Sequence, residues 1–321
     1  MSGLAGRVER WASQRPARVA GRNPWMTAVQ VLTQSIEDRV GGLAAEMAFF
    51  ALLSLLPLLI AVGAALGYLE LLVGAETIDR SIEQALDGAR AVFGQPFTRD
   101  SIRPLLVGLL TRQRGGTAIT GLVGAVYLSS RVFTATIRAL DIAYDLDEHR
   151  SLLAQRALAI AFSLGAVVVV PVTLAGLVVG PLLGSGQELA ASLGLSDAFA
   201  VVWSIGRWPA LFLLVVFFFT TLYRFGPNAR LGWTESVPGA LLGVVLWIVA
   251  SLGFRVYLAA GGGTTGVGDG AEEAVQQIAQ VVGAVVAAIL WIYLTSVVVL
   301  VGGELNAVLA REGPAPPPTS A

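Results

Sequence analysis

Six long apolar runs dominate the pattern of hydrophobic and polar positions along the chain. They cover residues 48–69, 116–137, 157–184, 208–223, 236–254 and 281–303, and polar or glycine-rich stretches separate them. A helix needs about 20 apolar residues to cross a hydrocarbon core of about 30 Å. Strands seldom exceed about ten residues, and the runs lack the alternation of a transmembrane barrel. Because a backbone in lipid must bond to itself, the pattern predicts an all-α polytopic membrane protein, a bundle of about six transmembrane helices.

Two stretches outside these runs predict amphipathic interfacial helices. In the connection between the first two runs, apolar residues fall at helical spacing with charges between them: Ile78, Ile82, Ala85, Leu86 and Ala89. This pattern indicates a helix that caps the bundle or lies at the outer interface. Residues 25–43 show a similar mixed face. They are either a helix on the inner surface, in contact with anionic lipid, or a solvated basic end.

The runs divide the chain into three expected parts. Residues 1–43 form a basic N-terminal segment, 44–312 the transmembrane domain with an outer loop of about 70–115, and 313–321 a disordered tail of sequence GPAPPPTSA. Residues 1–24 are too polar for a signal peptide. An even number of spans places both termini on one side. The distribution of arginines favours the cytoplasm, although the arginines of loop 70–115 weaken the asymmetry. We expect a multi-pass protein of the bacterial inner membrane.

The amino-acid composition limits the kinds of catalytic and binding sites that the chain can form. Hydrophobic residues make up 55% of the chain and charged residues 13%, whereas soluble domains carry about 25% charged residues. The absence of cysteine excludes disulfides, thiolate zinc sites and a cysteine nucleophile. All basic residues except His149 are arginines, which excludes a Schiff-base lysine and a phosphate-loop lysine. His149 lies in an acidic loop and is more simply structural than a metal ligand. We therefore expect no metal, no cofactor and no catalysis.

Polar residues in or beside the runs carry most of the functional signal, because burying them in lipid is costly. The candidates for a substrate or ion pathway are Glu46, Arg131, Arg138, Asp141, Arg255, Glu304 and Asn306. Three of them belong to one helical stripe, whose members recur at steps of three and four residues: Arg131, Thr134, Arg138, Asp141 and Asp145. One hypothesis is that Glu46, Arg131 and Glu304 face a polar cavity that contacts a charged substrate or a coupling ion. The alternative is that they pair with one another or reach the interface and only fix helix register.

Four segments resemble the YihY/virulence factor BrkB family, once labelled ribonuclease BN. They are AEMAFFALLSLLPLL from residue 45, SSRVFTATIRALDIAYD from 129, YRFGPNARLGWTESVPGALLGVVLWIVAS from 223 and ILWIYLTSVVVLVGGELNAV from 289. The motif positions are Ser54, Pro57, Arg131, Arg138, Tyr223, Pro227, Asn228, Pro238, Gly239, Trp247, Gly303, Glu304 and Asn306. The resemblance implies an inner-membrane protein of about six helices without a settled activity, and it transfers no catalytic role.

The leading functional expectation is a transporter or exporter of a lipid or an envelope component. A second hypothesis is a non-catalytic structural or assembly protein of the envelope. A membrane-associated ribonuclease is disfavoured, because the sequence lacks clustered carboxylates and a broad basic surface. The expected partners are membrane lipids and a lipid or small-molecule substrate, with no nucleic acid. The sequence does not indicate the substrate, the energy coupling or the oligomeric state.

Overall fold

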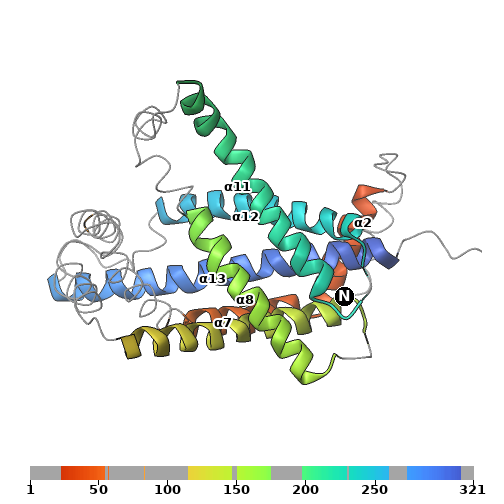
Figure 1. Cartoon of the computed structure of the whole chain (residues 1–321), viewed down its shortest axis with the longest axis horizontal. Coiled ribbons are helices and arrows are strands. Elements are labelled where there is room, and N and C mark those ends of the chain that lie inside the picture. Colours follow the sequence, from red (N-terminus) through yellow and green to blue (C-terminus); the bar gives the residue numbers. More distant parts are fainter. Residues whose placement is uncertain are drawn as a thin grey trace, which may run out of the picture. The chain divides into compact units, whose positions relative to one another are not determined.

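The regular elements of the protein are helices. A computed structural model describes residues 23–54, 57, 83, 115–146, 150–174, 197–229, 231–259 and 273–311, and within these ranges there is no strand. The helices are α2 (Pro24–Glu37), Val40–Ser54, α7 (Gly115–Ala143), α8 (Leu152–Leu174), α11 (Asp197–Phe225), α12 (Trp233–Ala259) and α13 (Glu273–Arg311), as Figure 1 shows. The all-α class predicted from the apolar runs is confirmed.

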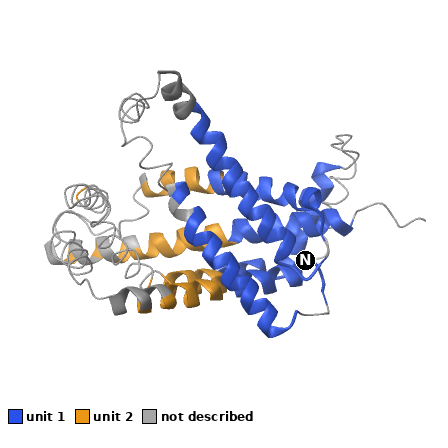
Figure 2. Ribbon diagram, in the orientation of Figure 1, with its two compact units in different colours: residues 1–44, 133–248, 297–321 blue, residues 45–132, 249–296 orange. Residues whose placement is uncertain are grey.

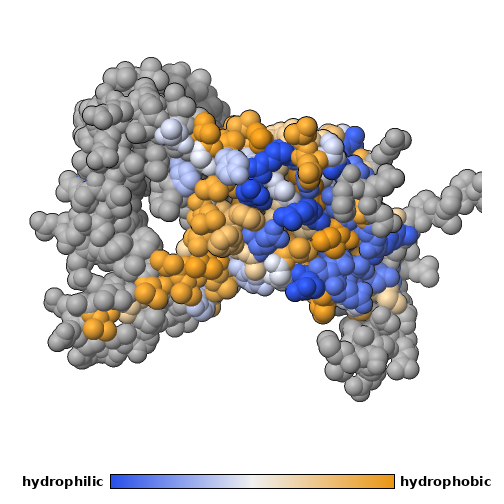
Figure 3. All heavy atoms as spheres, turned by 90° about the horizontal axis from the view of Figure 1, so that it is seen from below, coloured by the Kyte–Doolittle hydropathy of each residue, from blue (hydrophilic) through white to orange (hydrophobic). Residues whose placement is uncertain are grey.

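Four of these helices are long and apolar enough to cross a membrane. The segments are Leu152–Val169, Ile205–Phe225, Trp233–Leu258 and Val285–Arg311. Large apolar side chains on them, such as Leu213, Phe217 and Val249, are exposed. Contiguous apolar surface of this kind is visible in Figure 3 and is rare on soluble monomers. The polytopic membrane class is therefore confirmed.

The first two apolar runs are described by the structure to different extents. The run from residue 48 is described through the helix Val40–Ser54 and Pro57, and the second run lies within the 29 residues of α7. The interfacial helix expected over 78–89 lies outside the described residues except for Glu83, which is helical. The basic segment 1–22, the glycine-rich connection 261–270, His149 and the tail 313–321 also lie outside them. The expected domain bounds stay a prediction.

Residues 25–43 form two helices instead of one. Asn23 caps α2, because its side chain accepts hydrogen bonds from the backbone of Trp25 and Met26, and Pro24 occupies the first turn without needing a donor. Asp38 ends α2. Arg39 has a φ of 56°, in the left-handed region that helix ends use to reverse the chain. This turn separates α2 from the helix Val40–Ser54.

The described chain divides into two compact units, coloured in Figure 2. The first unit comprises residues 1–44, 133–248 and 297–321. Its core joins α7, α8 and α11 through Phe133, Phe162 and Phe218, whose ring centroids lie 5.8–6.4 Å apart. The second unit comprises residues 45–132 and 249–296. Within it Phe254 packs on Trp291 with a centroid distance of 5.2 Å.

Candidate functional site

A network of buried polar groups joins α11, α12 and α13 inside the first unit. The Tyr223 hydroxyl donates to the Val299 carbonyl oxygen at 2.7 Å. Asn306 uses both ends of its amide: Oδ1 accepts from the Gly239 backbone N–H at 2.7 Å and Nδ2 donates to the Ser236 carbonyl at 3.0 Å. All these groups are buried. The network holds three helices at one fixed spacing.

Asn306 bonds backbone groups on either side of a proline inside α12. Pro238 has no backbone N–H and disturbs the hydrogen bonding of the helix around it. The two backbone groups that Asn306 bonds, on Ser236 and Gly239, flank this proline. Neighbouring side chains are the usual means of satisfying such groups in a membrane helix. Three of the predicted motif positions therefore meet at one contact.

Glycines allow the helices to approach this closely. A Cβ atom on Gly239 would collide with the Gly302 carbonyl oxygen. A Cβ atom on Gly302 would lie 2.5 Å from the Tyr223 hydroxyl, and one on Gly303 would collide with the Leu140 side chain. Small residues at such crossings are typical of membrane helix packing. The predicted motif position Gly303 is thus explained by packing against α7.

Glu304 is buried beside this network, but the network supplies no hydrogen bond to its Oε2 atom. Its side chain is 2% exposed, and Oε2 has no hydrogen-bond partner in the described part of the chain. The Asp38 carboxyl group, at the end of α2, lies near the Glu304 carboxyl group. The nearby cation, Arg311, forms a 2.6 Å ion pair with Asp145 and donates to the Ala143 carbonyl at 2.7 Å. The result is a carboxyl pair at the end of a candidate span.

Asp141 and Pro227 organise the turn between α11 and α12. Asp141 is buried, and its Oδ1 accepts a 2.8 Å hydrogen bond from the Asn228 backbone N–H. Pro227 is fully buried next to it. Arg150 donates to the Phe225 carbonyl at 3.1 Å and more weakly to the Pro227 carbonyl at 3.5 Å. Asp141 thus holds the loop between α11 and α12 through the Asn228 backbone.

The other candidates are spread over the surface. Arg131, Arg138 and Arg255 are exposed, and Glu46 is half-buried. Arg131 donates to the Tyr127 hydroxyl at 3.1 Å and lies over its ring. Glu46, Arg131 and Arg255 belong to the second unit, whereas Arg138, Asp141, Glu304 and Asn306 belong to the first. A cavity shared by Glu46, Arg131 and Glu304 stays a prediction.

The remaining motif positions have packing roles or are only partly buried. Ser54 donates to the carbonyl of Ala51 at 2.7 Å. Pro57 lies opposite Gly124, where an added Cβ would touch it at 3.4 Å. Trp247 is half-buried on α12.

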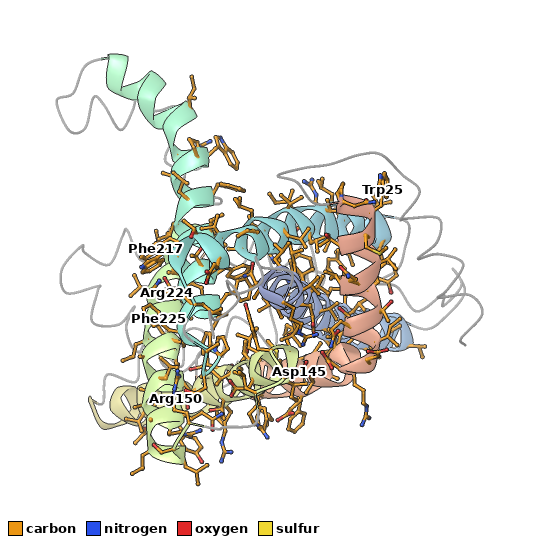
Figure 4. All side chains as sticks on the ribbon, turned by 90° about the vertical axis from the view of Figure 1, so that its right-hand side faces the viewer. Trp25, Asp145, Arg150, Phe217, Arg224 and Phe225 are labelled. Atoms are coloured by element: carbon orange, nitrogen blue, oxygen red, sulfur yellow. The ribbon has the colours of Figure 1, made fainter. Side chains whose placement is uncertain are left out.

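An arginine–aromatic cluster lies where α11 ends and α12 begins. The Arg224 guanidinium carbon lies 4.7 Å from the Trp233 ring centroid and 5.1 Å from that of Phe225. Phe217 stacks on Trp233 at 6.0 Å. Figure 4 labels Phe217, Arg224 and Phe225 along α11, with Arg150 below them. The cluster lies at the ends of two candidate spans, and aromatic residues are enriched at membrane–water interfaces.

Sequence reasoning missed Asp38, Gly302 and Trp233. Asp38 looked like one of several charges in a mixed surface segment, and Trp233 followed a span end without any sign that Phe217 stacks on it. Tyr144, directly after α7, was also passed over. Burial raises the pKa of the Tyr144 hydroxyl well above its ordinary value, and the nearby Glu235 and Glu304 carboxyls raise it further. Asp38, Tyr144 and Trp233 lie outside the apolar runs, and Gly302 lies at the end of the last run.

The described residues offer no metal centre. Within them, three or more histidine, aspartate or glutamate side chains nowhere gather in a way that could hold a metal ion. Carboxyl groups that do approach one another, on Asp38 and Glu304, form a pair and lack a third ligand of that kind.

Comparison with known proteins identifies relatives. The sequence model described as virulence factor BrkB matches residues 31–321. The ribonuclease-like protein YfkH of Bacillus subtilis (strain 168) is 28% identical over 269 residues, which cover 84% of this chain and 89% of that protein. No solved structure matches. The match begins within α2 and includes every later helix that the structure describes.

Proposed function

Because the chain belongs to the virulence factor BrkB family, we propose that it is a multi-pass protein of the bacterial inner membrane that transports a lipid or another envelope component. Both termini then lie in the cytoplasm. The observation that carries the proposal is the buried, incompletely partnered carboxyl group of Glu304 near the end of a candidate span.

A buried carboxyl oxygen without a hydrogen-bond partner destabilises the folded protein. Burying a polar group without a hydrogen bond costs about 1–3 kcal/mol by protein mutational data, and a charged group costs more. Ionisable residues within spans are rare and belong mostly to substrate or ion pathways. Among the described carboxyl oxygens, Glu304 Oε2 alone is buried without a partner. Asp141, by contrast, has a clear structural bond. Glu304 is therefore the candidate for a role in transport, in addition to any role in helix packing.

A lipid or an anionic envelope molecule suits the surface around the spans. Exposed arginines, including Arg131, Arg138 and Arg255, sit on helices that also expose large apolar side chains. Guanidinium groups bind phosphate in bidentate geometry and are weakly hydrated. The Arg224 cluster adds a cation held between aromatic rings at a span end. A molecule with an acyl chain and an anionic head group would be complementary to this surface.

Two other functions compete with transport. A ribonuclease would need a metal or an acid–base constellation, and the described residues hold no cluster of metal-binding side chains. Purified protein incubated with RNA and Mg²⁺ is expected to leave the RNA intact. A structural envelope protein would depend on its surface helices. Exchanging residues 78–89 would then impair the cell more than changing Glu304.

Transport is tested in liposomes that contain the purified chain and a phospholipid with a fluorescent head group. Dithionite quenches the label in the outer leaflet, so loss of the protected fraction reports movement between leaflets. Wild type should move the lipid faster than empty liposomes do. Glu304→Gln should slow it about tenfold or more, equivalent to about 1.4 kcal/mol in the barrier.

Glu37→Gln is the matched control, because Glu37 is exposed on α2 next to Asp38. It should transport like the wild type. Size-exclusion chromatography in detergent must show both variants to be folded and monodisperse. Equal rates for wild-type and empty liposomes, repeated with an anionic lipid, would rule out lipid movement as the activity.

A further inference from the structure

The Arg224 side chain, at the end of α11, is held by two aromatic rings. Its guanidinium carbon is 4.7 Å from the Trp233 ring centroid and 5.1 Å from that of Phe225. The Nε atom is enclosed, and it has no hydrogen-bond partner in the described part of the chain. Among the described residues, no carboxylate forms an ion pair with this guanidinium group. The rings therefore hold the cation in position, and no described residue neutralises its charge.

The polar groups near the cluster in sequence are bonded to other partners. Glu235 Oε2 accepts a 2.7 Å hydrogen bond from the Gly232 backbone N–H, as a glutamate in the first turn of a helix often does. The Phe225 carbonyl, at the end of α11, accepts from Arg150 at 3.1 Å. Figure 4 shows Arg224 and Phe225 on α11, with Arg150 below them. Arg224 is thus left for a group from outside the protein.

A second source of positive potential lies at the same place. Trp233 is the first residue of α12, a helix of 27 residues. The first N–H groups of a helix lack partners within the helix and carry the positive end of its dipole. Helix starts bind phosphate and other anions through these groups. Because the Arg224 guanidinium lies over the Trp233 ring, the side chain and the helix start favour an anion at one position.

An exposed apolar surface leads away from the cation along α11. Leu213, Phe217 and Arg224 share one face of the helix, because they are spaced by four and seven residues. Leu213 and Phe217 are 62% and 61% exposed, and Phe217 stacks on Trp233. From Leu213 to Arg224 the helix rises about 17 Å, close to half of a hydrocarbon core of about 30 Å. A phospholipid has this arrangement, with an acyl chain extending from a phosphate.

The spacing of arginines along α11 supports a position of Arg224 at the depth of lipid phosphates. Arg207 lies over the Trp208 ring, with its guanidinium carbon 5.2 Å from the ring centroid. It precedes Arg224 by 17 residues, or about 26 Å of helix. This length is close to the thickness of a hydrocarbon core, and tryptophans are enriched at both of its boundaries.

We propose that Arg224 and the start of α12 bind the phosphate of an anionic phospholipid, whose acyl chain lies along Leu213 and Phe217. A guanidinium group can offer two parallel hydrogen bonds to a phosphate. Inorganic phosphate would use the same cation but would leave the apolar face uncovered. Binding needs no movement of lipid between leaflets. Use of the site as the entry point for a transported lipid rests on the proposed function, whereas the binding itself does not.

Native mass spectrometry of the full-length protein in detergent tests the site. The protein is titrated with phosphatidylglycerol, with phosphatidylcholine of the same acyl chains, and with inorganic phosphate. Wild type should bind phosphatidylglycerol more tightly than phosphatidylcholine, and an excess of inorganic phosphate should not displace it. Arg224→Gln should weaken phosphatidylglycerol binding about tenfold, because hydrogen bonds to a charged group are lost. Arg224→Lys keeps the charge without the planar fork and should weaken it about threefold.

Arg311→Gln is the matched control. It also removes one positive charge from the first unit, but the Arg311 guanidinium is already paired with Asp145 at 2.6 Å. This variant should bind phosphatidylglycerol like the wild type. Size-exclusion chromatography must show each variant to be monodisperse. If Arg224→Gln fails this requirement, Arg224→Lys decides the point, and its unchanged affinity would then count against the site.

Three results would overturn the site. They are equal phosphatidylglycerol affinity in wild type and Arg224→Gln, equal binding of phosphatidylcholine and phosphatidylglycerol, and displacement of the lipid by inorganic phosphate. Selective binding together with absent lipid movement in the liposome assay would reject the transport function and leave the site standing. Normal lipid movement without selective binding would reject the site and leave the transport function standing.

Discussion

The Tyr223 hydroxyl on α11 and the Val299 carbonyl on α13, 76 residues apart in sequence, are joined by a 2.7 Å hydrogen bond in the core of the first unit. The same hydroxyl lies where a Cβ on Gly302 would come to 2.5 Å and one on Gly243 to 3.2 Å. One side chain from α11 therefore touches the two glycine-bearing helices at their crossing.

Tyr223→Phe should lower stability by about 0.5–1.5 kcal/mol, the usual net value of one hydrogen bond. The ring would still fill its space, so the loss isolates the hydroxyl. The measurement is the free energy of unfolding in detergent. Tyr257→Phe is the control, because Tyr257 is exposed on α12, and its effect should be close to zero. Equal losses in the two variants would contradict this role of the bond.

Gly239→Ala should force α12 and α13 apart and cost about 1–3 kcal/mol, the range for overpacking a core. The added methyl group would collide with the backbone oxygen of Gly302, which cannot rotate away. Gly253→Ala, in the same helix, is the matched control because nothing lies within 4 Å of its new methyl group. It should be neutral or slightly stabilising, since alanine favours helix. Thermal unfolding of both variants decides the point.

Asn306→Ala should cost about 2 kcal/mol, because two buried hydrogen bonds of about 1 kcal/mol each are lost. The backbone groups of Ser236 and Gly239 would be left beside Pro238 without their partner. Ser236→Ala removes only a hydroxyl that bonds the Gly232 carbonyl, so its loss should be smaller. If Ser236→Ala proves the more harmful change, the account of the proline contact is wrong.

Two aspartates near the end of α7 should differ in effect. Asp141→Ala leaves the Asn228 N–H without its acceptor and should cost about 1–3 kcal/mol. Asp145→Ala removes an ion pair to Arg311 whose partners are 70% and 38% exposed. Exposed pairs contribute about 0–1 kcal/mol, and the small loss should shrink further in high salt. Unfolding curves at low and high salt compare the two.

Local pattern predicted the elements of this fold well, because period and length are properties of neighbouring residues. The run 236–254 lies inside α12 and the run 281–303 inside α13. The stripe Arg131, Arg138 and Asp141 does lie on one helix, α7, but only Asp141 is buried. Spacing places residues on a helix face, whereas burial depends on which helices pack there.

The contacts that define the candidate site could not be predicted from the local sequence pattern. Gly239 and Asn306 are 67 residues apart, and Asp38 meets Glu304 from the other end of the chain. Pairings at this distance depend on helix crossings, which no local period encodes. Glu304 and Asn306 could be singled out because polar groups near a span end are costly, but their partners could not.

The backbone contact between Gly239 and Gly302 limits how this protein can change shape. Because neither glycine has a side chain, the backbones of the two helices are in close contact here. Rotation or sliding would bring each helix against the carbonyl groups of the other. The crossing therefore leaves little room for α12 and α13 to change their mutual orientation. Motion has to be sought in elements that approach it from outside, and a crosslink placed across α12 and α13 at this level should leave activity intact.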